Sequence, residues 1–361
     1  MLTKEAKETN MKKLTINTTK PYDIYIGAGI LSQAGKLIKE RFSKSRIALV
    51  SETNVFPLYG EKVLSVLREE GFDVVTHIFE AGEAQKNMQT VIEILGTLSE
   101  NKLTRTDIVV ALGGGVTGDM AGFASAIYLR GIKCVQIPTS YLAAVDSSTG
   151  GKTAVDLPAG KNLAGAFHMP SLVICDTDCF KTLSKETFED GVAESIKHGL
   201  IADADFFRFM LENDITENIE EVVRRNVEIK TSFVLGDEKD TGKRQMLNFG
   251  HTIGHAAEKV SNFALTHGHA IAIGMAVVLR AQEKLGIGEA GMTEKLLAAL
   301  KKYDLPSECP YSAEQLMSAA LQDKKRAGDK ISLVCLEKPG KAFLKPMNME
   351  ELEDIIRLGL E

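Results

Sequence analysis

The first half of the chain alternates short runs rich in β-branched residues with longer segments of helical spacing, and this alternation limits the fold more than any other feature. Such an order is typical of a mostly parallel sheet with helices on both faces. In these sheets, ligands bind outside the carboxyl ends of the strands. The sequence therefore predicts a Rossmann-like α/β domain with strands at residues 47–50, 74–78, 108–112, 135–137 and 172–174.

Beyond residue 180 the pattern changes to long helical segments. A late exception around Pro339 and Gly340 predicts a small hairpin at residues 331–335 and 342–344. A chain of 361 residues exceeds the usual size of one domain. We therefore expect an α/β domain over residues 1–180 and a mainly α-helical domain over residues 181–361. Its helices are expected at residues 184–198, 217–235, 245–260 and 270–285.

Composition and charge exclude several classes of protein. The formal net charge of −6 argues against general nucleic-acid binding, which normally requires a basic domain. The longest apolar run, at residues 270–279, is shorter than the roughly 20 residues that cross a bilayer, and residues 1–10 lack the apolar core of a signal peptide. Five cysteines without a Cys-x-x-Cys spacing indicate reduced thiols. We expect a cytoplasmic protein that binds neither nucleic acid nor membrane.

A glycine-rich segment at residues 113–119 follows one of the predicted strands and fits Gly-x-Gly-x-x-Gly. Glycines in this position let a pyrophosphate approach the backbone amides at a helix N-terminus. The acidic residue usually found about 20 residues later is absent, and a tight strand-to-helix turn is the simpler alternative. The segment predicts a dinucleotide or phosphate site of a non-standard type.

The histidines cluster late in the chain, because four of the seven lie between residues 251 and 269. His251 and His255 are one helical turn apart, so both imidazoles can face one ion. His267 follows shortly afterwards. A polar helix face is the alternative, and Thr252 stands where the metalloprotease signature has glutamate. Spacing alone predicts a divalent metal site, most plausibly for zinc, with His251 and His255 as ligands.

The stretch at residues 138–162 is dense in glycine, small polar residues and lysine. Glycines let backbone approach a ligand, and ammonium groups neutralise phosphate or carboxylate. A flexible surface loop is the alternative, but it would not require Asp146, Lys152 and Lys161 in such apolar surroundings. We interpret this stretch as a substrate loop.

Several motifs, each weak alone, together resemble the 3-dehydroquinate synthase family over nearly the whole chain and in the family's order. They occupy residues 113–119, 128–132, 145–155, 193–197, 244–255 and 267–268. The resemblance implies a dehydroquinate synthase-like and glycerol dehydrogenase-like architecture and a phosphorus–oxygen lyase of the shikimate pathway. Its reaction converts 3-deoxy-D-arabino-heptulosonate 7-phosphate to 3-dehydroquinate and phosphate. The implied steps are transient oxidation by NAD, phosphate elimination, reduction, ring opening and an intramolecular aldol reaction.

The resemblance also implies the cofactors, NAD and zinc or cobalt. Glu194, His251 and His267 would ligate the metal, and His255 would handle protons beside it instead of binding it. The implied NAD-binding positions are Glu52, Thr53, Asn54, Glu83, Lys86, Gly114, Gly115, Val116, Asp119, Thr139, Ser140, Lys161 and Thr182.

The implied substrate positions supply the positive charge that a phosphorylated acid requires in a net acidic chain. Arg130 would reach the pocket of a neighbouring subunit, which implies a homodimer. One of Lys324 and Lys325 would join the substrate site. The remaining substrate positions are Asp146, Lys152, Asn162, Lys197, Lys230, Arg244 and Asn248, and the implied catalytic residues are Asp146, Lys152, Lys197, Asp240 and His255.

The chain departs from the family pattern at three positions, because Ser140, Asp240 and His269 stand where threonine, glutamate and glutamate are commoner. The first two keep a hydroxyl or a carboxylate, whereas His269 adds an imidazole beside a proposed ligand. Three alternatives remain. They are a metal-dependent NAD alcohol dehydrogenase of the glycerol type, another sugar phosphate cyclase, and a silent NAD-binding regulatory protein.

Overall fold

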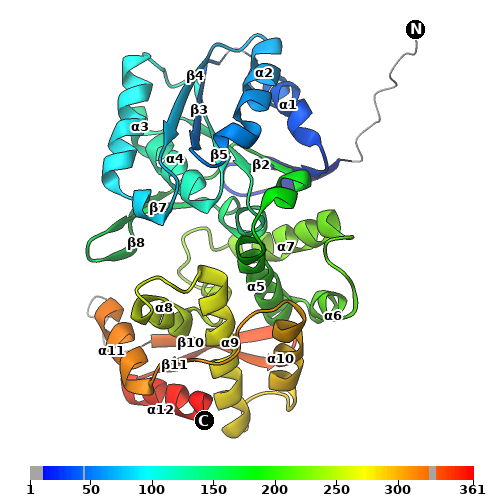
Figure 1. The fold of residues 1–361 in the computed structure, drawn as a ribbon, viewed down its shortest axis with the longest axis vertical. Coiled ribbons are helices and arrows are strands. Elements are labelled where there is room, and N and C mark those ends of the chain that lie inside the picture. The colour runs from blue at the N-terminus through cyan, green and yellow to red at the C-terminus, as the bar shows by residue number, and fades with distance from the viewer. Residues whose placement is uncertain (1–10, 44, 325–330) are drawn as a thin grey trace. The chain divides into compact units, whose positions relative to one another are not determined.

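The computed structural model describes residues 11–43, 45–324 and 331–361, with side chains assigned except at residues 321–324 (Figure 1). Predictions for residues 1–10 and for Lys325 lie outside this range. The chain forms two compact units. Unit 1 comprises Met1–Leu183 with Ile219–Arg224, and unit 2 comprises Ser184–Asn218 with Arg225–Glu361.

Unit 1 is built on a sheet that contains seven strands among the described residues, in the order β1-β2-β9-β6-β5-β3-β4. Strands β1 and β2 pair antiparallel, and every other pair is parallel, as the sequence predicts. The strands are β1 (Lys12–Ile16), β2 (Tyr22–Gly27), β3 (Ile47–Glu52), β4 (Val74–Phe79), β5 (Ile108–Gly113), β6 (Lys133–Pro138) and β9 (Leu172–Asp176).

Strands form at all five predicted runs. In the central strands, burial on both faces demands continuous apolar sequence, whereas β4 at the edge of the sheet is buried only at Phe79. All six residues of β5 are buried, and so are the first five of β3. Helices α3 and α4 contribute Val91, Ile94 and Met120 to the same core. The helices of unit 1 are α1 (Ala34–Arg41), α2 (Glu61–Glu69), α3 (Met88–Glu100) and α4 (Gly115–Ile127), and α7 (Ile219–Val234) begins there.

Part of the predicted substrate loop is regular structure, which corrects that expectation. Residues Lys152–Leu157 (β7) and Gly160–Phe167 (β8) form an antiparallel hairpin. Gly165 permits it, because a Cβ there would lie 2.1 Å from the carbonyl oxygen of Thr153. The preceding residues Ala143–Ser147 form a short helical turn. A stretch rich in glycine and alanine therefore forms an ordered hairpin here.

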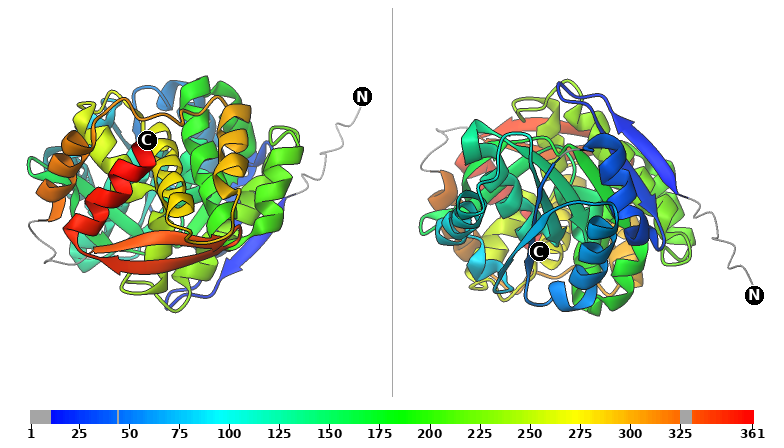
Figure 2. Two further views of the ribbon diagram at one scale, coloured as in Figure 1. Left: turned by 90° about the horizontal axis from the view of Figure 1, so that it is seen from below. Right: turned by 90° about the horizontal axis from the view of Figure 1, so that it is seen from above.

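Unit 2 is mainly helical and centres on α9 (His267–Lys284), which is buried over most of its length. The hairpin of β10 (Ile331–Lys338) and β11 (Lys341–Met347) confirms the predicted one. Together with α12 (Met349–Leu360), it packs on α9 and α5 (red and orange in Figure 2, left). The other helices are α5 (Lys185–Ala202), α6 (Ala204–Glu212), α8 (His251–Val260), α10 (Met292–Lys302) and α11 (Ala313–Lys324).

The helix predicted over residues 245–260 is interrupted, so that prediction is wrong in its first turn. Lys243–Asn248 form a 3-10 helix, and α8 begins only at His251. Gly250 separates them with a φ of 78°, a left-handed conformation that glycine adopts without strain. The break makes His251 the first residue of α8.

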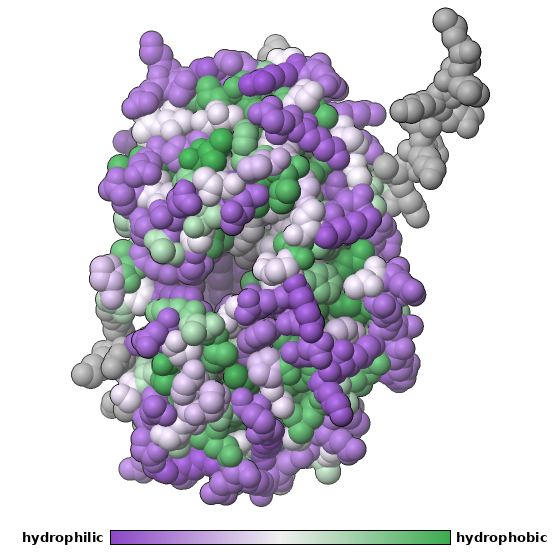
Figure 3. Space-filling model, in the orientation of Figure 1, coloured by the Kyte–Doolittle hydropathy of each residue, from purple (hydrophilic) through white to green (hydrophobic). Residues whose placement is uncertain are grey.

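No helix of the described residues is long and apolar enough to cross a membrane. On the face drawn in Figure 3, hydrophilic side chains are spread over both units.

The five cysteines are free, as predicted, and burial raises the pKa of the Cys134 and Cys179 thiols to about 12.

Candidate active site

Three side chains of unit 2 converge as a candidate metal centre. Glu194 lies in the middle of α5, and His251 and His267 are the first residues of α8 and α9. The Oε1 atom of Glu194 lies 3.2 Å from Nε2 of His267 and 3.6 Å from Nε2 of His251. One ligand atom from each residue lies within 4.8 Å of the other two.

These separations fit a tetrahedral metal. Nitrogen and oxygen ligands at zinc bond lengths of 2.0–2.2 Å lie about 3.4 Å from one another. Two imidazoles and one carboxylate also leave a coordination position open, as in catalytic zinc sites. The donor set therefore fits zinc or cobalt.

Hydrogen bonding and burial prepare His251 to bind a cation. Its Nδ1 lies 3.1 Å from the carbonyl oxygen of Phe249, so Nδ1–H can donate and leave the Nε2 lone pair available. Burial, aided by the charge of Lys197, lowers the pKa of His251 well below its usual value. The imidazole is consequently neutral, which is the form that ligates metals.

Glu194 is the electrostatic centre of the cluster. It is fully buried, and its Oε2 pairs with the ammonium group of Lys197, which is 1% exposed. Burial acts to raise the pKa of Glu194, but Lys197 and the two imidazoles lower it well below its usual range. Burial similarly opposes a charge on His267, but Glu194 outweighs it and raises the pKa of that imidazole.

Glycines at the contact between α8 and α9 let the two imidazoles approach each other. A Cβ on Gly274 would lie 2.0 Å from the carbonyl oxygen of Gly250, and a Cβ on Gly254 would lie 2.8 Å from that of Ala270. The ring centroids of His251 and His267 are 5.4 Å apart. Residues 250–254 thus bring the starts of both helices together.

His255 lies beside the cluster, with its ring centroid 5.2 Å from that of His251 and 6.0 Å from that of His267. It is exposed, and it forms a second group of ligand atoms with His267 and Glu258. Sequence reasoning missed the buried Glu258. Its position three residues after His255 and seven after His251 was the available signal, because such residues share a helix face.

Three cations predicted for substrate are buried in unit 2. Lys197, Lys230 and Arg244 are 1%, 6% and 1% exposed. Arg244 lies on the 3-10 helix before α8 and donates from Nη1 to the carbonyl oxygen of Glu238 at 2.7 Å. The exposed Asn248 ends the same 3-10 helix.

Asp237 organises the loop that carries Arg244. Its carboxylate accepts hydrogen bonds of 2.9 Å from the backbone amides of Thr241, Gly242 and Arg244. These bonds, with that of Arg244 the largest cause, lower the pKa of Asp237 to about 2. Asp240, predicted to be catalytic, lies inside this loop with a φ of 58°.

The predicted nucleotide positions of unit 1 gather at the carboxyl ends of its parallel strands. Strand β5 ends at Gly113, Gly114 caps α4, and α4 begins at Gly115. The first turn of α4 contains no acidic residue and no side-chain cap among the described residues, so its amides are available to an anion. This geometry fits a pyrophosphate. Val116 and Asp119 lie in the first turns of the same helix.

Lys86 contacts several of the polar groups beside this helix. It is 7% exposed, and its Nζ lies 2.8 Å from Asp119 and 2.7 Å from Oδ1 of Asn162. The structure therefore places Asn162, predicted for substrate, against a predicted NAD position. Sequence reasoning missed Asp156, which accepts a 2.7 Å hydrogen bond from the amide of Asn162.

The other predicted nucleotide positions make contacts with neighbouring residues of unit 1. Glu52 ends β3 and accepts hydrogen bonds from the amides of Asn54 and Val55. Further contacts join Thr53 to Ala81, Thr139 to Gly113, Ser140 to Ala143, Glu83 to Lys161 and Thr182 to Tyr59.

The remaining predicted substrate residues belong to different segments. Arg130 has a φ of 68° in a short 3-10 helix after α4. Asp146 lies in the helical turn before β7, and Lys152 is the first residue of β7. These residues and Arg130 belong to unit 1. Lys324 is the last residue of α11.

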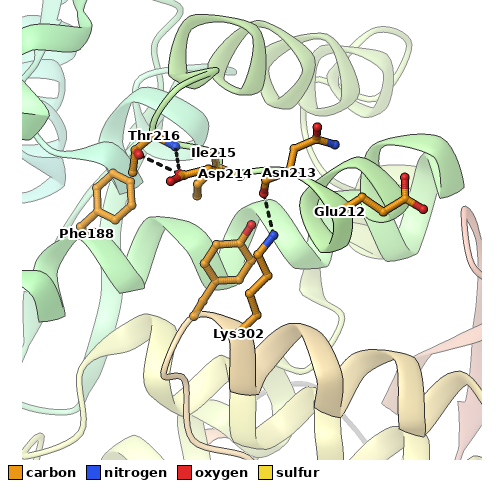
Figure 4. A pocket seen from close by; sticks show the side chains of 8 residues that line it. Phe188, Glu212, Asn213, Asp214, Ile215, Thr216 and Lys302 are labelled. Carbon is orange, nitrogen blue, oxygen red and sulfur yellow. Dashed lines mark hydrogen bonds between the residues drawn. The ribbon is translucent and has the colours of Figure 1, made fainter.

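A cavity of about 430 Å³ in unit 2 is separate from these residues (Figure 4). Its one lysine, Lys302, donates to the carbonyl oxygens of Met210, Leu211 and Asn213 at the end of α6. Asp214 similarly bonds Thr216. The polar groups of this cavity therefore stabilise the end of α6 and the turn that follows it, and we assign the cavity no role.

Comparisons with known proteins match nearly the whole chain. A family model described as 3-dehydroquinate synthase N-terminal matches residues 76–190, and one described as 3-dehydroquinate synthase C-terminal matches residues 191–326. A 3-dehydroquinate synthase of Clostridium acetobutylicum is 43% identical, over 93% of this chain and 96% of its own length.

Two solved structures share the fold at 24% identity. A 2-deoxy-scyllo-inosose synthase complexed with carbaglucose-6-phosphate, NAD+ and Co2+ has a TM-score of 0.85, covering 96% of this chain and 99% of its own. A 2-epi-5-epi-valiolone synthase from Streptomyces hygroscopicus, with NAD+ and Zn2+ bound, has a TM-score of 0.84, covering 92% and 95%.

Proposed function

We propose that this chain, which belongs to the 3-dehydroquinate synthase family, converts 3-deoxy-D-arabino-heptulosonate 7-phosphate to 3-dehydroquinate and phosphate. The observation that carries the proposal is the burial of Lys197, Lys230 and Arg244 in the unit that contains the candidate metal centre. Glu194 is an anionic partner of Lys197 within the protein. A substrate with a phosphate and a carboxylate requires several positive charges around it, and these three residues supply them in this proposal.

Glu194, His251 and His267 hold the metal in this proposal, and the carboxylate–imidazole set suits Zn2+ or Co2+. The amides at the start of α4 hold the NAD pyrophosphate, while Lys86 and Asp119 border it. Bound metal and NAD would together supply the polarisation and reversible oxidation of a substrate hydroxyl that make the neighbouring C–H acidic.

The chain's own residues bind and orient the substrate. Lys197, Lys230 and Arg244 neutralise it, and Asn248 adds a hydrogen-bonding group. The exposed imidazole of His255 holds or moves a proton beside the metal ligands. From unit 1, Asp146, Lys152 and Asn162 are assigned to the substrate, and Asp240 is assigned a catalytic role.

Quaternary structure and location complete the proposal. Arg130 serves the pocket of a second copy of the chain, so we propose a homodimer. One of Lys324 and Lys325 also contacts substrate. We further propose that the protein works in the cytoplasm, in aromatic amino acid biosynthesis.

A glycerol-type alcohol dehydrogenase is the second candidate, because it shares the architecture. It needs a metal and NAD but has no use for several buried cations. Another sugar phosphate cyclase would use those cations, but residues 145–155 favour the dehydroquinate reaction. A silent NAD-binding regulator would have no need of a three-ligand metal centre.

The test is a phosphate-release assay with 3-deoxy-D-arabino-heptulosonate 7-phosphate, with and without prior chelation, while NADH absorbance is followed. Glycerol is the control substrate. Chelator-sensitive phosphate release without net NADH is expected. Steady NADH formation without phosphate would favour the dehydrogenase, and NAD binding without any turnover would favour the regulator.

A further inference from the structure

Two adjacent acids on α5 contact the first turn of α9. The carboxylate of Asp190 accepts a 2.7 Å hydrogen bond from the backbone amide of Gly268. The Oε2 atom of the buried Glu189 lies 3.0 Å from Nε2 of His269. These contacts bridge residues about 80 positions apart, immediately after the candidate ligand His267.

Asp190 acts as an N-cap supplied by another helix. Helix α9 has no acidic residue in its first turn, and Thr266 at its N-cap makes no side-chain cap hydrogen bond. The first amides of a helix need acceptors, and a negative charge there is favoured by the helix dipole. Asp190 supplies both to the second residue of α9.

The helices meet at backbone distance at this point. A Cβ on Gly268 would lie 2.3 Å from Cα of Asp190, so only glycine permits the contact. Asp190 and Glu194 are one turn apart on α5 and lie on the same face. Helix α5 therefore carries the candidate ligand Glu194 and also binds Gly268, the residue next to the candidate ligand His267.

We propose that Asp190 is a positioning residue that sets the separation between Glu194 and His267, with the Glu189–His269 pair as a second clamp. The inference rests on the metal site of the proposed function. If His267 is free to shift from Glu194, the ligands are no longer spaced for one ion, and metal affinity falls although every ligand remains. Outer contacts of this kind typically change affinity about 10–100-fold.

The experiment measures the dissociation constant of Zn2+ for the full chain by chelator competition and the visible spectrum of bound Co2+. Asp190→Ala is expected to weaken Zn2+ binding about 10–100-fold and to alter the Co2+ bands. Asp190→Asn keeps an oxygen acceptor for the Gly268 amide and should restore most of the affinity. Glu186→Ala is the matched control, because Glu186 is an exposed acid in the first turn of α5.

Folding is monitored on the metal-free protein, and Asp190→Ser is made in parallel because its short side chain disturbs packing less but cannot reach the amide. Unchanged Zn2+ affinity and Co2+ spectrum in a folded Asp190→Ala or Asp190→Ser variant, even with a lowered melting temperature, would overturn the positioning role. His251→Ala separates the two proposals. If His251→Ala loses metal while Asp190→Ala binds it normally, only the positioning role is overturned. If His251→Ala retains all of its metal, the proposed metal site itself is overturned.

Discussion

The proposed nucleotide site at the start of α4 in unit 1, called the nucleotide edge, and the candidate metal cluster of Glu194, His251 and His267 in unit 2 are built in opposite ways. At the nucleotide edge, the consecutive residues Gly113, Gly114 and Gly115 present backbone amides at the start of α4. In the metal cluster, charged side chains come from three helices, and Glu194 and His267 are 73 residues apart. The first site depends on local backbone conformation, whereas the second depends on packing between helices.

The two sites therefore place different demands on the stability of the fold. Backbone amides at a helix start are present in any helix, so the nucleotide edge needs only glycines that keep side chains away. A buried carboxylate needs partners, and Glu194 has Lys197, His251 and His267 around it. Removing one member of the metal cluster should therefore cost more than obstructing the nucleotide edge.

The largest expected effect is that of Glu194→Ala. It removes the shared partner of both imidazoles and leaves the buried Lys197 without its carboxylate. We expect loss of bound metal, and a loss of about 3–5 kcal/mol in the free energy of unfolding, as for other broken buried pairs. Metal analysis and urea unfolding measure the two. Full metal content in the variant would contradict the comparison.

An obstruction of the nucleotide edge should have a smaller and separable effect. Gly115→Val adds bulk at the first residue of α4, beside the proposed pyrophosphate site, where its Cβ would lie 3.2 Å from Oγ of Ser147. We expect NAD binding to weaken at least about tenfold, or 1.4 kcal/mol, with metal content unchanged. Gly96→Ala on α3 is the control, because its Cβ meets nothing within 4 Å. Equal NAD affinity in both variants would move the nucleotide site elsewhere.

The cations proposed for substrate in the two units should respond alike to substitution, and differently from the residues of the proposed metal and NAD sites. Lys152→Ala in unit 1 and Arg244→Ala in unit 2 are each expected to lower kcat/KM about 10–100-fold, since a charged hydrogen bond contributes about 1.5–3 kcal/mol. NAD affinity should stay near that of the unaltered protein. Steady-state kinetics and NAD titration check this, and a parallel loss of NAD binding would place these residues in the cofactor site.

The smallest expected effect is the titration of Asp237, which holds the Arg244 loop. A carboxyl whose pKa is lowered on folding stabilises the fold at any pH above its ordinary pKa of 3.8. That contribution is lost as the pH falls toward the lowered pKa of about 2. Carboxyl carbon NMR should therefore give a midpoint near 2 for Asp237. A midpoint near 3.8 would show that the amides of Thr241, Gly242 and Arg244 do not hold the carboxylate.

The same contrast explains which features the sequence could predict. Strands buried on both faces, such as β3 and β5, require continuous apolar runs, so they were predictable. The hairpin β7–β8 was not, because its residues mix glycine, alanine and lysine and include only two β-branched residues, Thr153 and Val155. The helical spacing of residues 245–260 also hides the left-handed break at Gly250, since one glycine hardly disturbs the periodicity.

The sites divide similarly. Residues 113–119 form a continuous motif, so the helix start that they build could be predicted from local sequence. Asp190 belongs to no local motif, because its relevance arises only when α5 and α9 pack together. Spacing alone selected His255 as a ligand, and the family resemblance replaced it with Glu194 and His267 beside His251.

The measurement that tests the account most directly is X-ray absorption at the zinc edge of the purified, metal-loaded protein, compared with the His251→Ala variant. Two imidazole nitrogens and one carboxylate oxygen are expected at about 2.0–2.2 Å, with one imidazole lost in the variant. Sulfur ligands at about 2.3 Å, or an unchanged spectrum in the variant, would contradict a metal centre built from Glu194, His251 and His267.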